Sequence, residues 1–200
     1  MKKIEIIWRE LLYQTIEKKN RRFTQKGLAE KFNFSTSTVF QALKAPRKMG
    51  AVRVTGRFFV LEDPEKLLYH WASVRNFNKD IIFSGRVELP VFEIEGRMPS
   101  GIVFGGYTAA RQILKEASAD YDKVYVYLKP QPSALKKIKE RFQSGKGRTN
   151  LFVLKADPFL ENYGERTILA QTFVDIWNFE DWYAKEFVNS LKRKIDGFLS

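Results

Sequence analysis

Hydrophobic and polar positions in the first third of the chain follow helical spacing and then strand spacing. Ile4, Ile7, Trp8 and Leu11 recur on one side of a helix, which predicts an amphipathic helix over residues 3–19. Apolar runs separated by turn residues predict the remaining elements of this part: helices at 25–32 and 36–44, a β-hairpin at 51–61, and a helix that continues to about residue 75.

Single residues set the expected boundaries of the short helices. Thr24 and Ser35 carry hydroxyl groups that can accept a hydrogen bond from the first turn of a helix, so both are placed as N-caps. Asn33 tolerates the left-handed backbone conformation of a tight turn. Pro46 has no backbone N–H group, and it is expected to stop the second short helix near Lys44.

After residue 76 the pattern changes to alternating strands and helices. The periodicity predicts strands at 81–84, 87–94, 101–105, 123–128 and 150–155, and helices at 107–117 and 133–142. Residues 165–179 fit a helix or a strand. Apolar residues at positions 183, 187, 191 and 195 predict an amphipathic terminal helix.

Charge is concentrated in the first third of the chain. The protein has 35 Lys and Arg against 23 Asp and Glu, a net charge of +12. Residues 1–61 hold 14 of the basic residues and only 4 acidic ones, whereas residues 62–200 hold 21 and 19. A basic segment beside a nearly neutral one is typical of a module that binds a polyanion, the alternative being a solvated basic surface.

The composition excludes several kinds of chemistry. The absence of cysteine excludes disulfides, a thiolate metal site and a cysteine nucleophile, and the single histidine, His70, excludes a multi-histidine zinc site. No apolar run approaches the roughly 20 residues that span a bilayer. Glu5, Arg9 and Glu10 interrupt the apolar stretch that a signal peptide would need. We expect a cytoplasmic protein without a membrane segment, a metal or a cofactor.

The spacing of residues 25–44 is that of a helix-turn-helix. Counting from Gln25, the small residue Ala29 takes the fifth position, where two helices cross closely, and Asn33 takes the ninth, in the turn. Apolar residues take the positions that join the two helices: Phe34, Val39 and Ala42. With the hairpin that follows, residues 4–61 resemble winged helix-turn-helix regulators.

This resemblance implies that the second helix of the pair enters the major groove of double-stranded DNA. Gln41 can contact adenine, Lys44 can reach guanine or phosphate, and Phe40 either joins the core or touches a thymine methyl group. The arginines near the hairpin turn, expected at Thr55 and Gly56, would meet the backbone. For the hydroxyl groups the alternative is helix capping. The candidate DNA-binding residues are Gln25, Ser35, Thr36, Ser37, Thr38, Gln41, Lys44, Arg47, Lys48, Arg53, Thr55 and Arg57.

The rest of the chain carries no recognised catalytic motif. Gly105 and Gly106 precede a helix but lack the spacing of a phosphate-binding loop, which favours a tight turn. Glu93 and Glu95 are expected on one face of a strand, in solvent. The five aromatic rings between residues 177 and 187 exceed what one helix usually buries, and they predict a surface for a partner or for a homo-oligomer. The alternative is that all five pack in the core of this domain.

The whole layout is similar to archaeal relatives of the AbiEi antitoxin group. The similar parts are the winged helix, the helix over residues 62–76, the GGYTAAR helix at 105–111 and the segment at 165–179. The resemblance implies repression of the protein's own operon and neutralisation of a nucleotidyltransferase-like toxin. A DNA-targeted nuclease or nucleotidyltransferase, and a ligand-responsive repressor, remain as alternatives.

These observations together predict a fold of the α+β class (mixed α/β). Its expected parts are a winged helix-turn-helix domain over residues 1–61, a linking helix over 62–76 and a C-terminal α/β interaction domain over 77–200.

Overall fold

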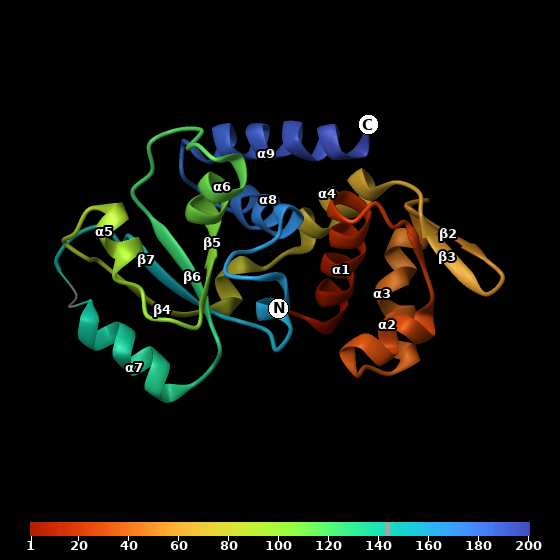
Figure 1. The fold of residues 1–200 in the computed structure, drawn as a ribbon, viewed down its shortest axis with the longest axis horizontal. Coiled ribbons are helices and arrows are strands. Elements are labelled where there is room, and N and C mark those ends of the chain that lie inside the picture. Colours follow the sequence, from red (N-terminus) through yellow and green to blue (C-terminus); the bar gives the residue numbers. More distant parts are fainter. Residues whose placement is uncertain (143–144) are drawn as a thin grey trace. The chain divides into compact units, whose positions relative to one another are not determined.

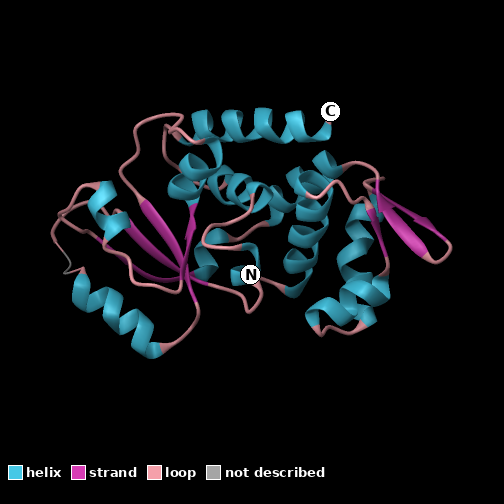
Figure 2. Cartoon of the chain, viewed as in Figure 1, coloured by secondary structure: helices cyan, strands magenta, loops and turns pink. Residues whose placement is uncertain are grey.

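The structure is a computed structural model that describes residues 1–142 and 145–200, and it confirms the α+β class (Figures 1 and 2). The chain divides into two compact units. The first comprises Met1–Arg75 together with Ile195–Ser200, and the second comprises Asn76–Lys194. Among the described residues, no helix has both the length and the apolar character needed to cross a bilayer.

The first unit combines helices with a small antiparallel sheet. Its helices are α1 (Lys3–Glu17), α2 (Gln25–Phe32), α3 (Thr36–Lys48) and α4 (Pro64–Val74). Its strands, in the sheet order β1-β3-β2, are β1 (Arg22–Phe23), β2 (Val52–Thr55) and β3 (Phe58–Leu61). The sequence pattern missed β1, because two residues cannot show a strand periodicity.

Helix α1 holds the first unit together, since both α3 and α4 pack against it. Ile7 and Leu11 of α1 and Trp71 of α4 have no exposed surface. The buried carboxylate of Glu5 joins α1 to the end of α4: the indole N–H of Trp71 donates to Glu5 Oε2 over 3.2 Å, and Arg75 lies 3.5 Å from the same oxygen. Removing one partner would leave a buried charge uncompensated.

The predicted end of α3 near Lys44 is wrong, because the helix continues to Lys48 with Pro46 inside it. In a regular helix, the N–H of residue 46 would donate to the carbonyl of Ala42, and proline has no such group. The indole N–H of Trp8 in α1 donates to this carbonyl over 2.7 Å, and both residues are buried. Trp8 therefore supplies the donor that the proline lacks.

The second unit is built on a mixed sheet in the order β4-β7-β6-β5, in which β6 and β7 are parallel and the outer pairs antiparallel. Its strands are β4 (Ile81–Gly85), β5 (Ile102–Gly105), β6 (Val124–Leu128) and β7 (Leu151–Lys155). Its helices are α5 (Val91–Gly96), α6 (Gly106–Leu114), α7 (Pro132–Arg141) and α8 (Leu169–Trp177), with 3-10 turns at Phe77–Asp80 and Leu160–Tyr163. Helix α9 (Ala184–Leu199) belongs to this unit as far as Lys194 and to the first unit from Ile195.

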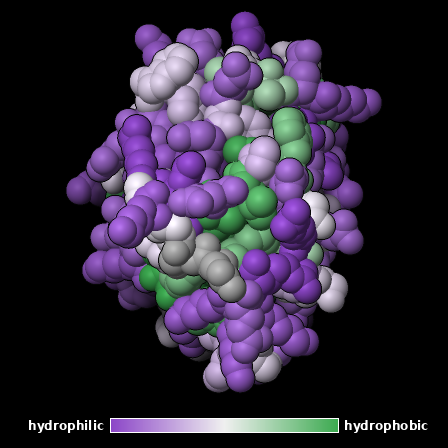
Figure 3. Space-filling view, turned by 90° about the vertical axis from the view of Figure 1, so that its left-hand side faces the viewer, coloured by the Kyte–Doolittle hydropathy of each residue, from purple (hydrophilic) through white to green (hydrophobic). Residues whose placement is uncertain are grey.

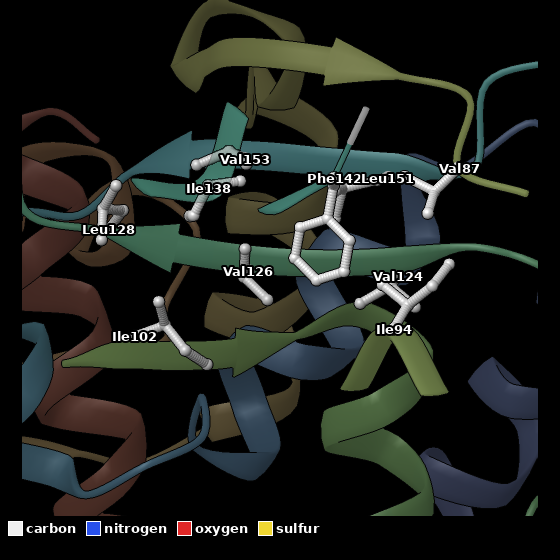
Figure 4. Packing of buried hydrophobic residues seen from close by; sticks show 10 residues of the cluster. All are labelled: Val87, Ile94, Ile102, Val124, Val126, Leu128, Ile138, Phe142, Leu151 and Val153. Atoms are coloured by element: carbon white, nitrogen blue, oxygen red, sulfur yellow. The ribbon is translucent and has the colours of Figure 1, made fainter. Parts of the chain in front are cut away.

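One face of this sheet packs against α5 and α7. Ile138 of α7 lies beside Val126 and Val153 of the central strands, and Ile94 of α5 lies beside Val124 (Figure 4). In the side view of Figure 3, apolar surface shows between polar side chains. Partly buried apolar residues pack around this core, and Leu135 is one of them.

The opposite face of the sheet carries an aromatic cluster. Tyr125 stacks on Phe179 with a centroid distance of 4.3 Å, and Tyr107 packs edge-on against both rings. The hydroxyl of Tyr107 donates to Asp181 Oδ2 over 2.9 Å. Burial, and then the charge of Asp181, raise the pKa of Tyr107, so this phenol remains a donor at any physiological pH.

Gly105 and Gly106 are explained by close packing on β6. Gly106 has a φ of +52°, and a Cβ atom there would lie 2.7 Å from the ring of Tyr125. A Cβ at Gly105 would lie 2.8 Å from the ring of Tyr127. Gly106 therefore suits the left-handed turn and the close approach to Tyr125, and Gly105 allows the close approach of the backbone to Tyr127.

The strand predicted at 87–94 is wrong, because Pro90 is the N-cap of helix α5. Glu95, expected in solvent, has a side chain only 8% exposed, and its Oε2 accepts from Arg111 over 2.7 Å. Its Oε1 accepts from the hydroxyl of Thr108 over 2.7 Å. A six-residue helix is too short for its periodicity to be told from that of a strand.

Phe179 is half-buried in the aromatic cluster described above, and the other four aromatic residues between 177 and 187 divide into two groups. Tyr183 and Phe187 are buried in the second unit, and the ring of Phe187 lies 4.9 Å from that of Tyr107. Trp177 and Trp182 are 48% and 83% exposed. The segment therefore serves both the core and the surface, and its role in binding a partner or a second copy stays a prediction.

The role of Trp8 can be measured with a double-mutant cycle. Trp8→Phe should lower the free energy of unfolding, because it leaves the buried Ala42 carbonyl without a donor, which costs about 1–3 kcal/mol in addition to lost packing. In a Pro46→Ala background, the restored N–H can bond to Ala42, so the same change should cost less by about 1 kcal/mol or more. Urea denaturation measures both; an equal loss in the two backgrounds would show that the indole hydrogen bond is not what supports α3.

Candidate nucleic-acid interface

The turn between α2 and α3 has the local geometry that the sequence predicts. Thr24 caps α2 by accepting from Gly27 N over 3.0 Å, and Ser35 caps α3 by accepting from Thr38 N over 3.2 Å. Asn33 adopts the left-handed conformation, with φ 50° and ψ 45°. Ala29 is buried, and α2 packs directly against α3. The start of α3 is thus fixed by residues that precede it.

Helix α3 has one apolar face and one basic, polar face. Its buried residues are Val39, Ala42, Leu43 and Pro46. After Thr36, the exposed first residue, the exposed residues follow at intervals of three and four along the other face: Ser37, Phe40, Gln41, Lys44, Arg47 and Lys48. No acidic residue occurs between Thr36 and Lys48. We call these six residues the exposed face of α3.

Three polar side chains of this face have no hydrogen-bond or ion-pair partner among the described residues. In the part of the chain that the structure describes, the side chains of Gln41, Arg47 and Lys48 take part in no hydrogen bond or ion pair. Lys44 lies 5.6 Å from the ring centroid of Phe40. The basic groups are therefore available to an external anion, and they need not leave an internal partner to reach it.

The hydroxyl groups at the start of α3 have separate roles. Ser35 Oγ lies 2.9 Å from Ser37 Oγ and 2.9 Å from Thr38 Oγ1, in addition to capping the helix. Ser35 is thus engaged in the cap, as the capping alternative proposed. Thr36 and Ser37 are exposed, whereas Thr38 is half-buried.

The hairpin turn lies one residue later than predicted. Thr55 is the last residue of β2 and pairs with Phe58, so Gly56 and Arg57 form the two-residue turn. Gly56 has a φ of +55°, which glycine adopts without strain. Arg57 is exposed at the turn. The hairpin lies beside α3 in the first unit, and β2 contacts this helix (Figure 1).

Arg53, unlike Arg57, is paired within the protein. Its Nε donates to Glu62 Oε1 over 2.6 Å, and its terminal nitrogen lies 2.5 Å from the same oxygen. Both side chains are largely in solvent, so the pair contributes little stability and can exchange for another anion. Gln25, the first residue of α2, is half-buried and lies outside the exposed face of α3.

Sequence reasoning missed the basic residue that lies against the hairpin. The guanidinium of Arg22 in β1 stacks on the ring of Phe58, 3.4 Å from the centroid. Arg21, the residue before it, is exposed. In the sequence both belong to the polar run KKNRR at 18–22, which shows no strand periodicity. Pairing of β1 with β3 brings this run to the hairpin.

The histidine adds nothing to the positive charge of the first unit at neutral pH. His70 packs edge-on against Trp8 with a centroid distance of 5.1 Å, and burial lowers its pKa. Among the described residues, no three histidine or carboxylate side chains gather as a metal ion would require.

Comparison with protein-family models, with curated proteins and with solved structures finds no match to this chain.

The two serines at the start of α3 should differ in their effect on stability. Ser35→Ala removes the N-cap and should lower the free energy of unfolding by about 1 kcal/mol. Ser37→Ala, on the exposed face, should change it by less than about 0.5 kcal/mol. Thermal and urea denaturation of the full chain check both. If Ser37→Ala lowers the free energy of unfolding as much as Ser35→Ala does, Ser35 is not the residue that caps α3.

Proposed function

We propose that the first unit is a winged helix-turn-helix module and that the protein is a transcriptional regulator that binds double-stranded DNA at preferred sequences. The observation that carries the proposal is the exposed face of α3, which combines basic and amide side chains with no acidic residue. A solvated helix face would normally mix both signs of charge. A face without carboxylates suits a polyanion, because none of its groups repels phosphate.

The geometry of an α-helix supports contact in the major groove. This groove is about 12 Å wide, and a helix entering it presents its N-terminal residues to the base edges. Ser37 and Gln41 stand in the first two turns of α3, where base contacts would form. Lys44 lies one turn later, and Arg47 and Lys48 lie in the last turn, where phosphates are within reach.

The hairpin would extend this contact along the DNA backbone. Arg57 at its turn is exposed, and Arg22 stacks on Phe58 beside that turn. Contacts of this kind position a protein on the duplex and carry little sequence information. We therefore assign affinity mainly to the lysines and arginines, and sequence preference to the side chains in the first turns of α3.

We further propose that the preferred sequence lies upstream of the protein's own gene. This part of the proposal follows from the resemblance to AbiEi antitoxins, which also suggests a nucleotidyltransferase-like toxin as a partner of the second unit. Binding of the full chain to its own upstream region, compared with an unrelated duplex of equal length, tests the first point. Selection from a random duplex library supplies the site if the upstream region is not bound.

Salt dependence should separate backbone contacts from other basic residues. Each phosphate contact removed should reduce the slope of log K against log salt by about 0.9. Arg57→Ala, Arg47→Ala and Lys48→Ala should therefore each weaken binding to all duplexes and flatten this slope. Lys137→Ala is the matched control, since Lys137 is exposed on α7 of the second unit. Fluorescence anisotropy between about 50 and 200 mM salt measures the slopes; a Lys137→Ala effect equal to the others would place the interface elsewhere.

Gln41→Ala should change sequence preference more than overall affinity. Loss of an amide that bonds to adenine should remove about 1–3 kcal/mol of discrimination at one base pair. The control is Gln112→Ala, an exposed glutamine on α6 of the second unit. Competition with single-base variants of the selected duplex gives the preference at each position. An unchanged profile for Gln41→Ala would mean that α3 docks in a different rotation.

A further inference from the structure

Phe40 is an apolar ring on an otherwise polar and basic surface. It is 41% exposed, and it stands among Ser37, Gln41 and Lys44 on the exposed face of α3. In the part of the chain described by the structure, no other aromatic ring contacts it. The ring thus keeps a large apolar surface in water, within the group of side chains to which the proposed function assigns sequence preference.

The position of Phe40 explains why it does not join the core. A helix turns by about 100° per residue, so Phe40 lies a quarter-turn or more from Val39, on the side toward Gln41. Val39, Ala42 and Leu43 have no exposed surface and fill the apolar face of α3. Lys44 Nζ lies 5.6 Å from the Phe40 ring centroid, one turn further on. The ring is therefore directed to the same surface as the polar residues.

The major groove offers one apolar group to such a ring. Thymine presents its C5-methyl group there, whereas the other bases present hydrogen-bond donors and acceptors at the major-groove edge. Contact with the methyl group would remove apolar surface of both partners from water. A cytosine at the same place carries only hydrogen on C5, so this apolar contact would be lost.

We propose that Phe40 recognises the C5-methyl group of a thymine, so that the duplexes bound by this protein carry a thymine at one defined position. The inference rests on the proposed function, because it requires α3 to enter the major groove. It adds a specificity determinant that polar readout by Ser37 and Gln41 does not provide. In this recognition, the ring of Phe40 contacts the thymine methyl group by apolar contact alone.

Replacing thymine by deoxyuridine tests the methyl group directly, because the change removes only that group. In the selected duplex, each thymine is replaced in turn, and the Kd of the full-length protein is measured by fluorescence anisotropy. At one thymine, or at its equivalents in repeated half-sites, deoxyuridine should weaken wild-type binding roughly fourfold. Phe40→Ala should bind the two duplexes equally, and Phe40→Leu should keep part of the difference.

Two controls separate this effect from others. Val74→Ala truncates an apolar residue of α4 with similar exposure, 43%, and should leave the deoxyuridine effect intact. Thermal unfolding of each variant verifies that the first unit is folded. The inference is overturned, with DNA binding itself retained, if the Kd of the wild-type protein changes at no thymine when deoxyuridine replaces it. It is likewise overturned if Phe40→Ala keeps the full difference between the two duplexes. The inference is also overturned if Phe40→Ala weakens binding to the thymine duplex and to the deoxyuridine duplex by the same factor, which is the result expected if Phe40 packs against a protein. Failure to bind any duplex overturns both proposals.

Discussion

The hydrogen bond from the indole of Trp8 to the carbonyl of Ala42 is the interaction on which the exposed face of α3 depends. Pro46 would otherwise leave that carbonyl without a donor in the interior of the unit. With this bond in place, α3 continues for one more turn, and Arg47 and Lys48 are on the same helix as Lys44. A buried contact between α1 and α3 thus determines how many basic groups one rigid element presents.

The two ends of α3 are fixed by different kinds of interaction. Its start depends on Asn33 in the left-handed conformation and on the Ser35 cap, both of which lie within a few residues of the helix. Its end depends on α1, more than thirty residues earlier in the chain. This difference explains what the sequence could predict. The caps at Thr24 and Ser35 and the turn at Asn33 are local, and their predictions are confirmed, whereas the effect of Pro46 depends on a distant donor and was predicted wrongly.

The same distinction holds elsewhere in the chain. The strands at the centre of the second unit were predicted because their apolar runs are long, but α5 was not, since its six residues carry too little periodicity. The ion pair of Arg53 with Glu62 and the stack of Arg22 on Phe58 arise from strand pairing, which a sequence alone does not specify. Residue types on the exposed face of α3 could be predicted; the availability of each side chain required the structure.

The small number of base-contacting side chains in the proposed interface limits the length of the DNA sequence that one copy of the protein can recognise. In the proposed interface, Ser37, Phe40 and Gln41 are the exposed side chains to which base contacts are assigned, and each would contact roughly one base pair. A site of about three base pairs recurs throughout any genome, so phosphate contacts would hold the protein at a great many places. Selective regulation therefore calls for two copies on one duplex, which multiplies their separate preferences and ties them to a fixed spacing. That requirement would give a physical reason for the homo-oligomer expected from the sequence, which stays a prediction, as does a role in it for Trp182, which is exposed on the second unit.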